Sequence, residues 1–149
     1  MSYSVTLGEG KFSKAFGKEL HCSPKHSQNI SRAIKGMKIS EAEQLLEKIC
    51  EKREPLPFRT HLGKMSHRKG GFGPGAYPVK AASMIAGVLK NVKSNAESSG
   101  LDPENSVIIH CSAYKGRPIP GTKPRAHGRA TKWDKQRTNI ELVVKELEG

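Results

Sequence analysis

The chain has 149 residues, a length that suits one domain with one modest core. Apolar residues make up 35% and aromatic residues 5%, so we expect part of the chain not to pack into a core of its own. Lysine and arginine total 26 against 14 aspartates and glutamates, a formal net charge of +12. So basic a chain repels itself when compact, which indicates an anionic partner, either nucleic-acid phosphates or an acidic membrane surface.

The sequence argues against membrane and secretory proteins. Its longest mainly apolar stretch, Val79–Leu89, is interrupted by polar residues and is far too short to span a bilayer. Residues 1–17 lack the apolar run of a signal peptide. The three cysteines, Cys22, Cys50 and Cys111, are odd in number and far apart, as expected for reduced thiols. We therefore expect a cytoplasmic protein with no membrane contact.

Three helices are predicted in the first two thirds of the chain. Ser23-Pro24 is typical of a helix start, and apolar residues at helical spacing follow it. A second helix is predicted from the capping box Ser40-Glu41-Ala42-Glu43, whose last glutamate can reach back to the cap, and Pro55 prevents it from continuing. The third is predicted to begin near Pro78 and to end at Gly100.

The last third of the chain favours strands. Val107–Ile109 and Ile140–Val144 are predicted strands by their β-branched content, and a short strand at Ala15–Cys22 could add a third. The connection between the two late strands, Tyr114–Thr138, is unusually long. Helices followed by strands favour an α+β fold, with three helices packed on one face of a small antiparallel sheet.

The basic residues are segregated from the acidic ones. Neither Pro55–Ala96 nor Asn105–Trp133 contains an aspartate or glutamate. A run of charge on a helix is as often a solvated face, but Tyr114–Thr138 is longer than most loops of compact domains and has almost no apolar side chains. We expect it to be floppy alone and to order against RNA, whose phosphates attract lysine and arginine. Trp133 either stacks on a base or is simply exposed.

Other classes of site are poorly supported. Six histidines and three cysteines permit a zinc hypothesis, but the chain has no CxxC motif and no two close pairs of ligands. Gly70–Gly75 lacks the lysine of a phosphate-binding P-loop, and carboxylates for acid–base catalysis are scarce on the basic surface. We predict no metal, no cofactor, no small-molecule substrate and no enzyme. A free-standing DNA-binding regulator or RNA chaperone, and an enzyme acting on RNA, remain alternatives.

An ordered series of motifs resembles one ribosomal protein family. The motifs are Ser23-Pro24-Lys25, Ile34-Lys35-Gly36-Met37, Tyr77-Pro78-Val79-Lys80-Ala81-Ala82, Pro124-Arg125-Ala126-His127-Gly128-Arg129-Ala130 and Thr138-Asn139-Ile140-Glu141-Leu142-Val143-Val144. Across Lys14–Leu147 they resemble the universal large-subunit protein numbered twenty-two in bacterial naming and seventeen in older eukaryotic naming. The stretch His67–Pro78 resembles its archaeal and eukaryotic branch.

The resemblance implies a single domain, residues 1–149, in which residues 14–113 and 138–147 form a small body at the subunit surface. Residues 114–138 would form a long extended β-hairpin arm that passes through ribosomal RNA and helps line the polypeptide exit tunnel. Its tip would lie near Pro120–Arg129. The implied partners are large-subunit ribosomal RNA, neighbouring ribosomal proteins and, at the tip, the nascent chain. The implied location is the large ribosomal subunit in the cytoplasm, with a role in subunit assembly.

The candidate RNA-binding residues are basic or aromatic side chains of the body and of the predicted arm. On the body they are Lys25, Arg59, Lys64, His67, Arg68, Lys69 and Lys80. On the arm they are Lys115, Arg117, Lys123, Arg125, His127, Arg129, Lys132, Trp133, Lys135 and Arg137. No residue is predicted to be catalytic or to bind a metal.

Overall fold

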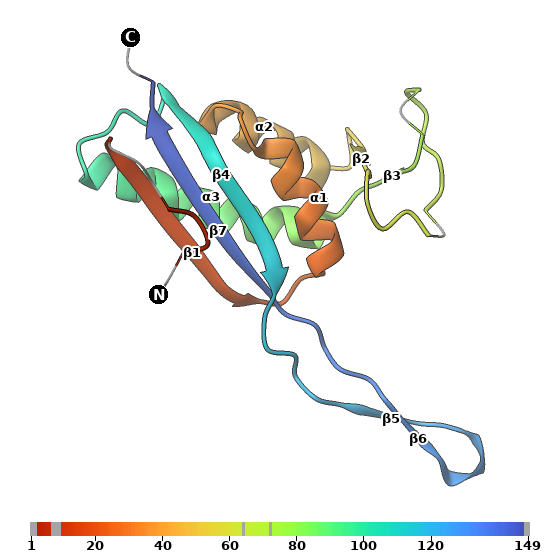
Figure 1. Ribbon diagram of the computed structural model, residues 1–149. Helices are drawn as coiled ribbons and strands as arrows, with labels where there is room; N and C mark the ends of the chain where they lie inside the picture. Colours follow the sequence, from red (N-terminus) through yellow and green to blue (C-terminus); the bar gives the residue numbers. More distant parts are fainter. Residues whose placement is uncertain (1–2, 7–9, 64, 72, 148–149) are drawn as a thin grey trace.

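Three helices lie on one face of a three-stranded antiparallel sheet in the part of the chain that the computed structural model describes, residues 3–6, 10–63, 65–71 and 73–147 (Figure 1). The sheet consists of β1 (Phe12–Leu20), β4 (Ser106–Lys115) and β7 (Thr138–Glu146). The helices are α1 (Pro24–Ile34), α2 (Ile39–Cys50) and α3 (Val79–Ser98). Two shorter strand pairs are β2 (Leu56–Pro57) with β3 (Gly75–Ala76) and β5 (Thr122–Pro124) with β6 (Ala130–Lys132). This confirms the predicted α+β architecture.

Strand β7 lies in the centre of the sheet, between β1 and β4. Alternate residues of a strand point to opposite faces, and Ile140, Leu142 and Val144 point into the core beneath the helices. The two late strands therefore pair as predicted. The predicted third strand is also present as β1, although it begins three residues earlier and ends two residues earlier than Ala15–Cys22.

Each helix buries one apolar stripe against the sheet or a neighbouring helix. The fully buried large side chains of the three stripes include Ile30, Ile34, Leu46, Ile49, Ile85 and Leu89. Removing each such side chain from water stabilises the fold by roughly 1.5–3 kcal/mol. The predicted starts of α1 and α3 are confirmed, because Pro24 is the first residue of α1 and Val79 that of α3.

The predicted capping box of α2 is wrong in register. The helix begins at Ile39, and Lys38 rather than Ser40 precedes its first turn. The backbone N–H of Lys38 donates to Glu41 Oε2 at 3.3 Å, so Glu41 plays the part expected of Glu43. The cause is tertiary: Ile108 N–H donates to the Met37 carbonyl at 2.9 Å, and Lys38 bridges to Val107, which brings the chain to its helix start beside β4.

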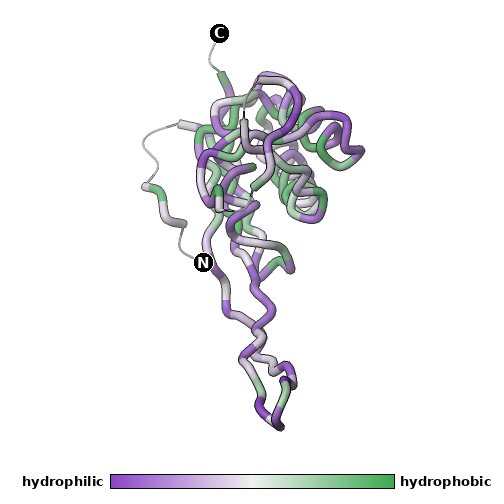
Figure 2. The backbone as a smooth tube through the Cα atoms, turned by 90° about the vertical axis from the view of Figure 1, so that its right-hand side faces the viewer, coloured by the Kyte–Doolittle hydropathy of each residue, from purple (hydrophilic) through white to green (hydrophobic). Residues whose placement is uncertain are grey.

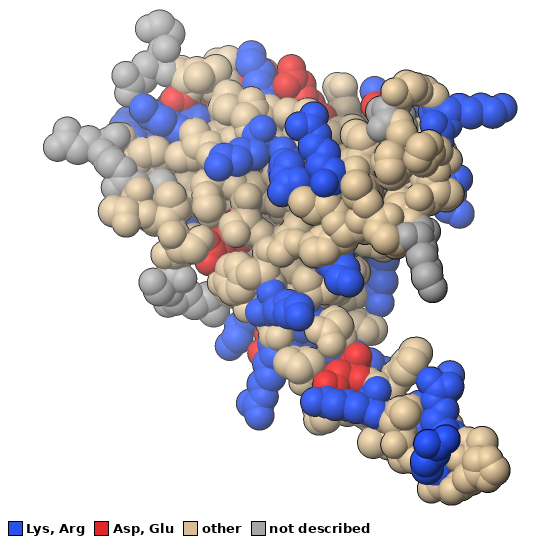
Figure 3. Space-filling view, turned by 45° about the vertical axis from the view of Figure 1, so that its right-hand side comes forward, with Lys and Arg blue, Asp and Glu red and all other residues tan. Residues whose placement is uncertain are grey.

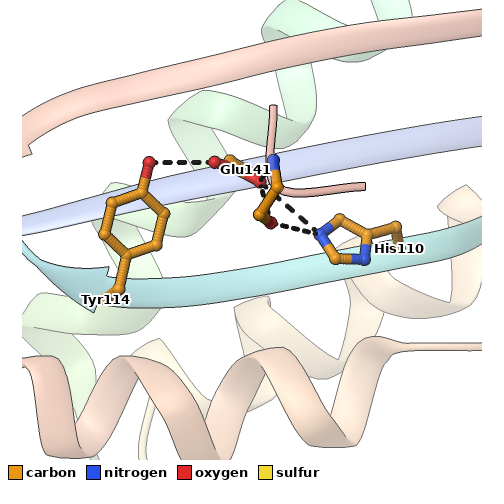
Figure 4. A network of polar contacts seen from close by, with 4 residues as sticks. His110, Tyr114 and Glu141 are labelled. Carbon is orange, nitrogen blue, oxygen red and sulfur yellow. Dashed lines mark hydrogen bonds and ion pairs between the residues drawn. The ribbon is translucent and has the colours of Figure 1, made fainter. Parts of the chain in front are cut away.

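The face of the sheet away from the helices carries a polar network around Glu141, on β7 (Figure 4). The carboxylate accepts hydrogen bonds from the Tyr114 hydroxyl at 2.8 Å and from the backbone N–H of Ser4 at 2.9 Å. His110 Nε2 lies 3.6 Å from it, and the Glu141 side chain is only 1% exposed. The ring of Tyr3 meets that of Phe16 edge-on, with centroids 6.1 Å apart. Residues 3 and 4 therefore cover part of this face.

These contacts control the ionisation of Glu141. Burial raises the pKa of the carboxyl, but the hydrogen bonds from Ser4 and Tyr114 and the charge of His110 outweigh it, so the pKa lies below its ordinary value. The pKa of Tyr114 is raised by burial and by its bond to the carboxylate. Glu141 is therefore a buried anion that ties the N-terminal residues to β4 and β7.

Candidate nucleic-acid interface

The connection between β4 and β7 is a hairpin arm that extends beyond the end of the sheet (Figure 1). Its two sides are joined by the pair β5–β6 and, nearer the body, by two hydrogen bonds of 2.9 Å between Ile119 and Lys135. Pro118 and Pro120 flank Ile119 and have no N–H to donate, which keeps this side extended but sparsely bonded. The arm predicted for residues 114–138 is thus a paired hairpin over most of its length.

The tip of the arm is a tight turn at residues 125–129. Arg125 N–H donates to the Arg129 carbonyl at 2.7 Å, and Ala126–Gly128 form the turn between them, in which His127 departs from helical geometry. His127 and Gly128 both have positive φ, of 58° and 66°, a conformation that glycine adopts without strain and histidine tolerates. The turn holds two exposed arginine side chains at the far end of the molecule.

Lysine and arginine side chains are distributed along the arm in Figure 3, and most of its backbone is coloured hydrophilic or neutral in Figure 2. Residues 114–138 contain eight lysines and arginines and a single acid, Asp134. That carboxylate is occupied within the arm, because Lys132 Nζ lies 3.1 Å from it and the Gly121 N–H donates to it at 3.4 Å. The aspartate therefore holds the two sides of the arm together, and its charge is largely offset by Lys132.

Trp133 lies on the surface of the arm with 57% of its area exposed. Lys123 Nζ, from the opposite side of the hairpin, lies 4.9 Å from the centre of its ring. Gly121 lies directly behind the tryptophan backbone, where an added Cβ would come within 2.8 Å of the Trp133 carbonyl oxygen. Both readings left open by the sequence remain, because an exposed indole also offers its ring to a base.

The long connection between α2 and α3, Pro55–Pro78, carries most of the predicted RNA-binding residues of the body. Its first part is held to α1 by the buried side chain of Asn29, whose amide oxygen accepts from Arg59 N–H at 3.1 Å. The same amide donates to the Lys25 carbonyl at 2.9 Å. Asn29 thus brings together two predicted residues, Lys25 and Arg59. A surface hollow next to Lys25 is lined by Asn29, Arg59 and Arg32.

The second part of this connection fixes the side chain of Arg68. Arg68 Nε donates to the Gly75 carbonyl at 3.2 Å, and its guanidinium lies 5.4 Å from the centre of the Tyr77 ring. A hollow next to it is lined by Arg53, Pro55, His67, Arg68, Lys69 and Tyr77. A guanidinium held in place loses less conformational entropy when it binds a phosphate.

The predicted residues therefore fall into separate groups. Exposed along the arm are Lys115, Arg117, Lys123, Arg125, His127, Arg129, Lys132, Trp133 and Lys135. Arg137 is half-buried and pairs with Glu19. Lys80 lines neither hollow, and its Nζ lies 3.1 Å from His21 Nδ1. Lys64 lies outside the described residues.

Sequence reasoning missed Arg32 and Arg53, which line the two hollows of the body. Arg32 shares α1 with only one other lysine or arginine, Lys25, and Arg53 follows the acidic second helix. Neither belongs to a basic run, so only the tertiary fold reveals their neighbours.

The described residues give little support to a metal site, an acid–base catalytic site or a membrane-spanning helix. Within them, no three histidine, cysteine, aspartate or glutamate side chains are close enough to hold a metal ion. His110, Tyr114 and Glu141 form a cluster of titratable groups, in which the Glu141 carboxylate is bound by Ser4 and Tyr114. No helix of the described chain is both long and apolar enough to cross a bilayer.

Comparison with known proteins gives a consistent family match. The family model described as ribosomal protein L22p/L17e matches residues 15–145. The large ribosomal subunit protein uL22 of Methanococcoides burtonii is 42% identical over 147 residues, which cover 99% of this chain and 97% of the relative. The protein of the same name from Archaeoglobus fulgidus is 48% identical over 138 residues, covering 91% and 89%. That of Methanopyrus kandleri is 43% identical over 143 residues, covering 94% and 90%.

Proposed function

Because the chain belongs to the ribosomal protein family L22p/L17e, we propose that it is a structural component of the large ribosomal subunit that binds ribosomal RNA through its arm. The protein then resides in the cytoplasm, within the subunit, among ribosomal RNA and other ribosomal proteins. It has no catalytic role, since members of this family are structural proteins of the ribosome. The body of residues 14–113 and 138–147 and the arm of residues 114–138 act as one domain.

The observation that carries this proposal is the charge of the arm. The hairpin carries eight lysines and arginines, two of which form ion pairs, with Asp134 and with Glu19, and its only acid is occupied internally. Such an arm repels itself and gains little from the body, whereas RNA phosphates on both sides would neutralise it and release counterions. Glycine and proline backbone and an exposed tryptophan suit close approach to RNA strands and bases.

The body adds two further RNA contacts to this proposal. Arg59 at one hollow, with Lys25 nearby on α1, and His67, Arg68 and Lys69 at the other hollow would bind phosphates where the subunit RNA meets the body. The fixed guanidinium of Arg68 supports the second contact. Contacts from both the body and the arm would hold distant RNA segments at a set spacing, which is how a small protein can support subunit assembly.

We assign the tip of the arm to the polypeptide exit tunnel and to contact with the nascent chain. Support comes from the position of the tip, at the far end of a hairpin that extends away from the body (Figure 1). Arg125 and Arg129 are exposed there, and His127 lies between them in the turn. The arginines would bind the tunnel's phosphates, and the small residues of the turn would leave room for a passing chain.

The test is sucrose-gradient sedimentation of cell extract, with each fraction probed for this protein before and after a moderate salt wash. A large-subunit protein co-migrates with that subunit and survives the wash. Recovery as free protein, or release with the first salt step, would instead favour a free-standing regulator or RNA chaperone. A variant with Arg125→Gln and Arg129→Gln is expected to detach at lower salt than the wild type. A matched Lys48→Gln variant, altered at a lysine that pairs with Glu54 on the body, is expected to behave as wild type.

A further inference from the structure

We propose that Glu19, Arg137, Asn139 and Gly116 form a root clamp that sets the direction in which the arm leaves the body. In this proposal Arg137 is a positioning residue and not one of the RNA contacts. The value of the clamp for RNA binding rests on the function proposed above, but its effect on the arm root does not.

The clamp begins with an irregularity in β1. Gly17 pairs with Ile140 and Leu20 with Thr138, so two residues of β1 face the single residue Asn139 of β7. This is a β-bulge, a feature that bends a strand and redirects its side chains. Glu19 has a positive φ of 51°, which is uncommon for a residue other than glycine. Such a conformation persists only where the surrounding contacts hold it.

Two contacts hold Glu19 in this conformation, one from Asn139 of β7 and one from Arg137, which precedes β7. The Glu19 N–H donates to the side-chain oxygen of Asn139 at 2.8 Å, which replaces a bond of the regular ladder. The Glu19 carboxylate accepts from Arg137 Nη1 at 2.8 Å. Both side chains of the ion pair are about one third exposed, at 31% and 32%. The pair is therefore partly shielded from solvent, and stronger than one on an open surface.

The clamp also reaches the outgoing side of the arm. The Gly116 N–H donates to the Arg137 carbonyl at 2.8 Å. Arg137 therefore bonds to Glu19 through its side chain and to the opposite side of the hairpin through its backbone. Just behind it, the Thr138 hydroxyl donates to the Cys22 carbonyl at 2.8 Å, in the interior. The root is thus fixed to β1 from one side and to the interior from the other.

Beyond the clamp the two sides of the arm separate. The next backbone hydrogen bonds between them within the described residues join Ile119 and Lys135, so Arg117, Pro118 and Gln136 form an unpaired joint. A joint of this kind can bend. The orientation of the outer arm, from Ile119 to Lys135, therefore depends on the hydrogen-bonded residues Gly116 and Arg137 at the root. Arg137 directly follows Gln136 in the chain, so the Glu19–Arg137 pair lies at the body end of that joint.

This arrangement gives Arg137 a role that can be distinguished from phosphate binding. If Arg137 bound a phosphate, removing the competing carboxylate of Glu19 would strengthen RNA binding. If the pair is a clamp, removing either partner loosens the root, and the arm must be ordered at the moment of binding, which weakens affinity. The two roles therefore predict opposite effects for Glu19→Gln.

The first experiment measures amide hydrogen exchange in the full chain without RNA. Glu19→Gln and Arg137→Gln should each lower the protection of the Gly116 amide about two- to fivefold, while amides in the middle of β4 keep theirs. The exchanged pair, Glu19→Arg with Arg137→Glu, should restore it. Glu51→Gln, which breaks another glutamate–arginine pair of 2.8 Å, is the control and should leave Gly116 unchanged. Equal protection of Gly116 in all variants would overturn the clamp.

The second experiment measures binding to a transcript of large-subunit ribosomal RNA over a range of salt concentrations. Glu19→Gln and Arg137→Gln should each weaken binding about two- to fivefold without changing the salt slope, and the exchanged pair should recover wild-type affinity. Tighter binding by Glu19→Gln, or a slope lowered by about one in Arg137→Gln, would return Arg137 to the RNA contacts. If the wild type itself does not bind, the proposed function fails, and the exchange result still decides the clamp.

Discussion

Replacing the two tip arginines tests the central role of the arm. Arg125 and Arg129 are exposed, and neither pairs with a carboxylate within the described residues. The nearest polar partner of the Arg125 guanidinium is the hydroxyl of Thr131, whose oxygen lies 3.1 Å from Arg125 Nε. We expect Arg125→Gln and Arg129→Gln each to lower the slope of log affinity against log salt by about one.

The size of the whole effect follows from the charges on the arm. Of its eight cations, Lys132 pairs with Asp134 and Arg137 with Glu19, which leaves Lys115, Arg117, Lys123, Arg125, Arg129 and Lys135. If each neutralises one phosphate, the arm contributes a slope of about −5. Raising the salt from about 50 to about 200 mM would then weaken binding about 10³-fold, of which each tip arginine accounts for roughly a factor of three to four.

The assay is equilibrium binding of the purified chain to a large-subunit ribosomal RNA transcript at several salt concentrations. Lys48→Gln is the matched control, because its Nζ lies 3.5 Å from Glu54 at the end of the acidic helix α2. A double variant with an unchanged slope would refute the reasoning. So would an equal loss of slope in Lys48→Gln, since the effect would then come from net charge and not from the arm.

Three further predictions concern the body and the arm backbone. Glu141→Gln should destabilise the fold by about 1–3 kcal/mol in urea titration, because hydrogen bonds to a buried anion are weakened. The pKa of Glu141 is lowered in the folded protein. Its ionised form therefore contributes to the free energy of unfolding above the ordinary pKa of 4.5, and this contribution is lost as the pH falls through the folded pKa. Glu141→Gln should therefore lose less stability under acid than the wild type. Cys111 should resist alkylation at pH 8, and Cys50 should react first. Burial raises the pKa of Cys111 to about 11, and Cys50 is less buried. Mass spectrometry of the labelled peptides checks this, and the opposite order of labelling would contradict the packing. Gly121→Ala should force the arm strands apart and expose the Trp133 amide to exchange, with the melting temperature of the body unchanged; a protected amide would contradict the close approach.

The spacing of apolar residues and the positions of proline and glycine were enough to predict the helices and the main sheet. Apolar spacing identified the buried stripes, and proline and glycine marked the helix ends, because these are local properties of the chain. The start of α2 was displaced by two residues, since a contact with β4 overrides the local preference of Ser40 for a cap. The pair β2–β3 lies in a proline- and glycine-rich stretch and gives no strand signal of its own.

The candidate site was predictable in its residues but not in its arrangement. The absence of acids around the arm was visible in the sequence, whereas the positions of Arg32 and Arg53 depend on how α1 and the long connection pack. Arg137 resembled every other cation of the arm, and its partner lies 118 residues away in the chain. Glu141 likewise looked like one polar residue in a strand, and residues 3 and 4 make it a buried anion. Long-range pairings of this kind leave no local pattern.

The prolines of the arm have a consequence for the time before the protein reaches its RNA. A two-stranded hairpin has two open edges, and an open edge can pair with the edge of another copy and lead to aggregation. Pro118, Pro120 and Pro124 remove donors from one edge, and the lysines and arginines on both sides repel a second arm of the same charge. A newly made chain can therefore stay in solution at high concentration although no RNA covers its hairpin. Replacing these prolines with threonine would make the arm more regular but lower the solubility of the protein.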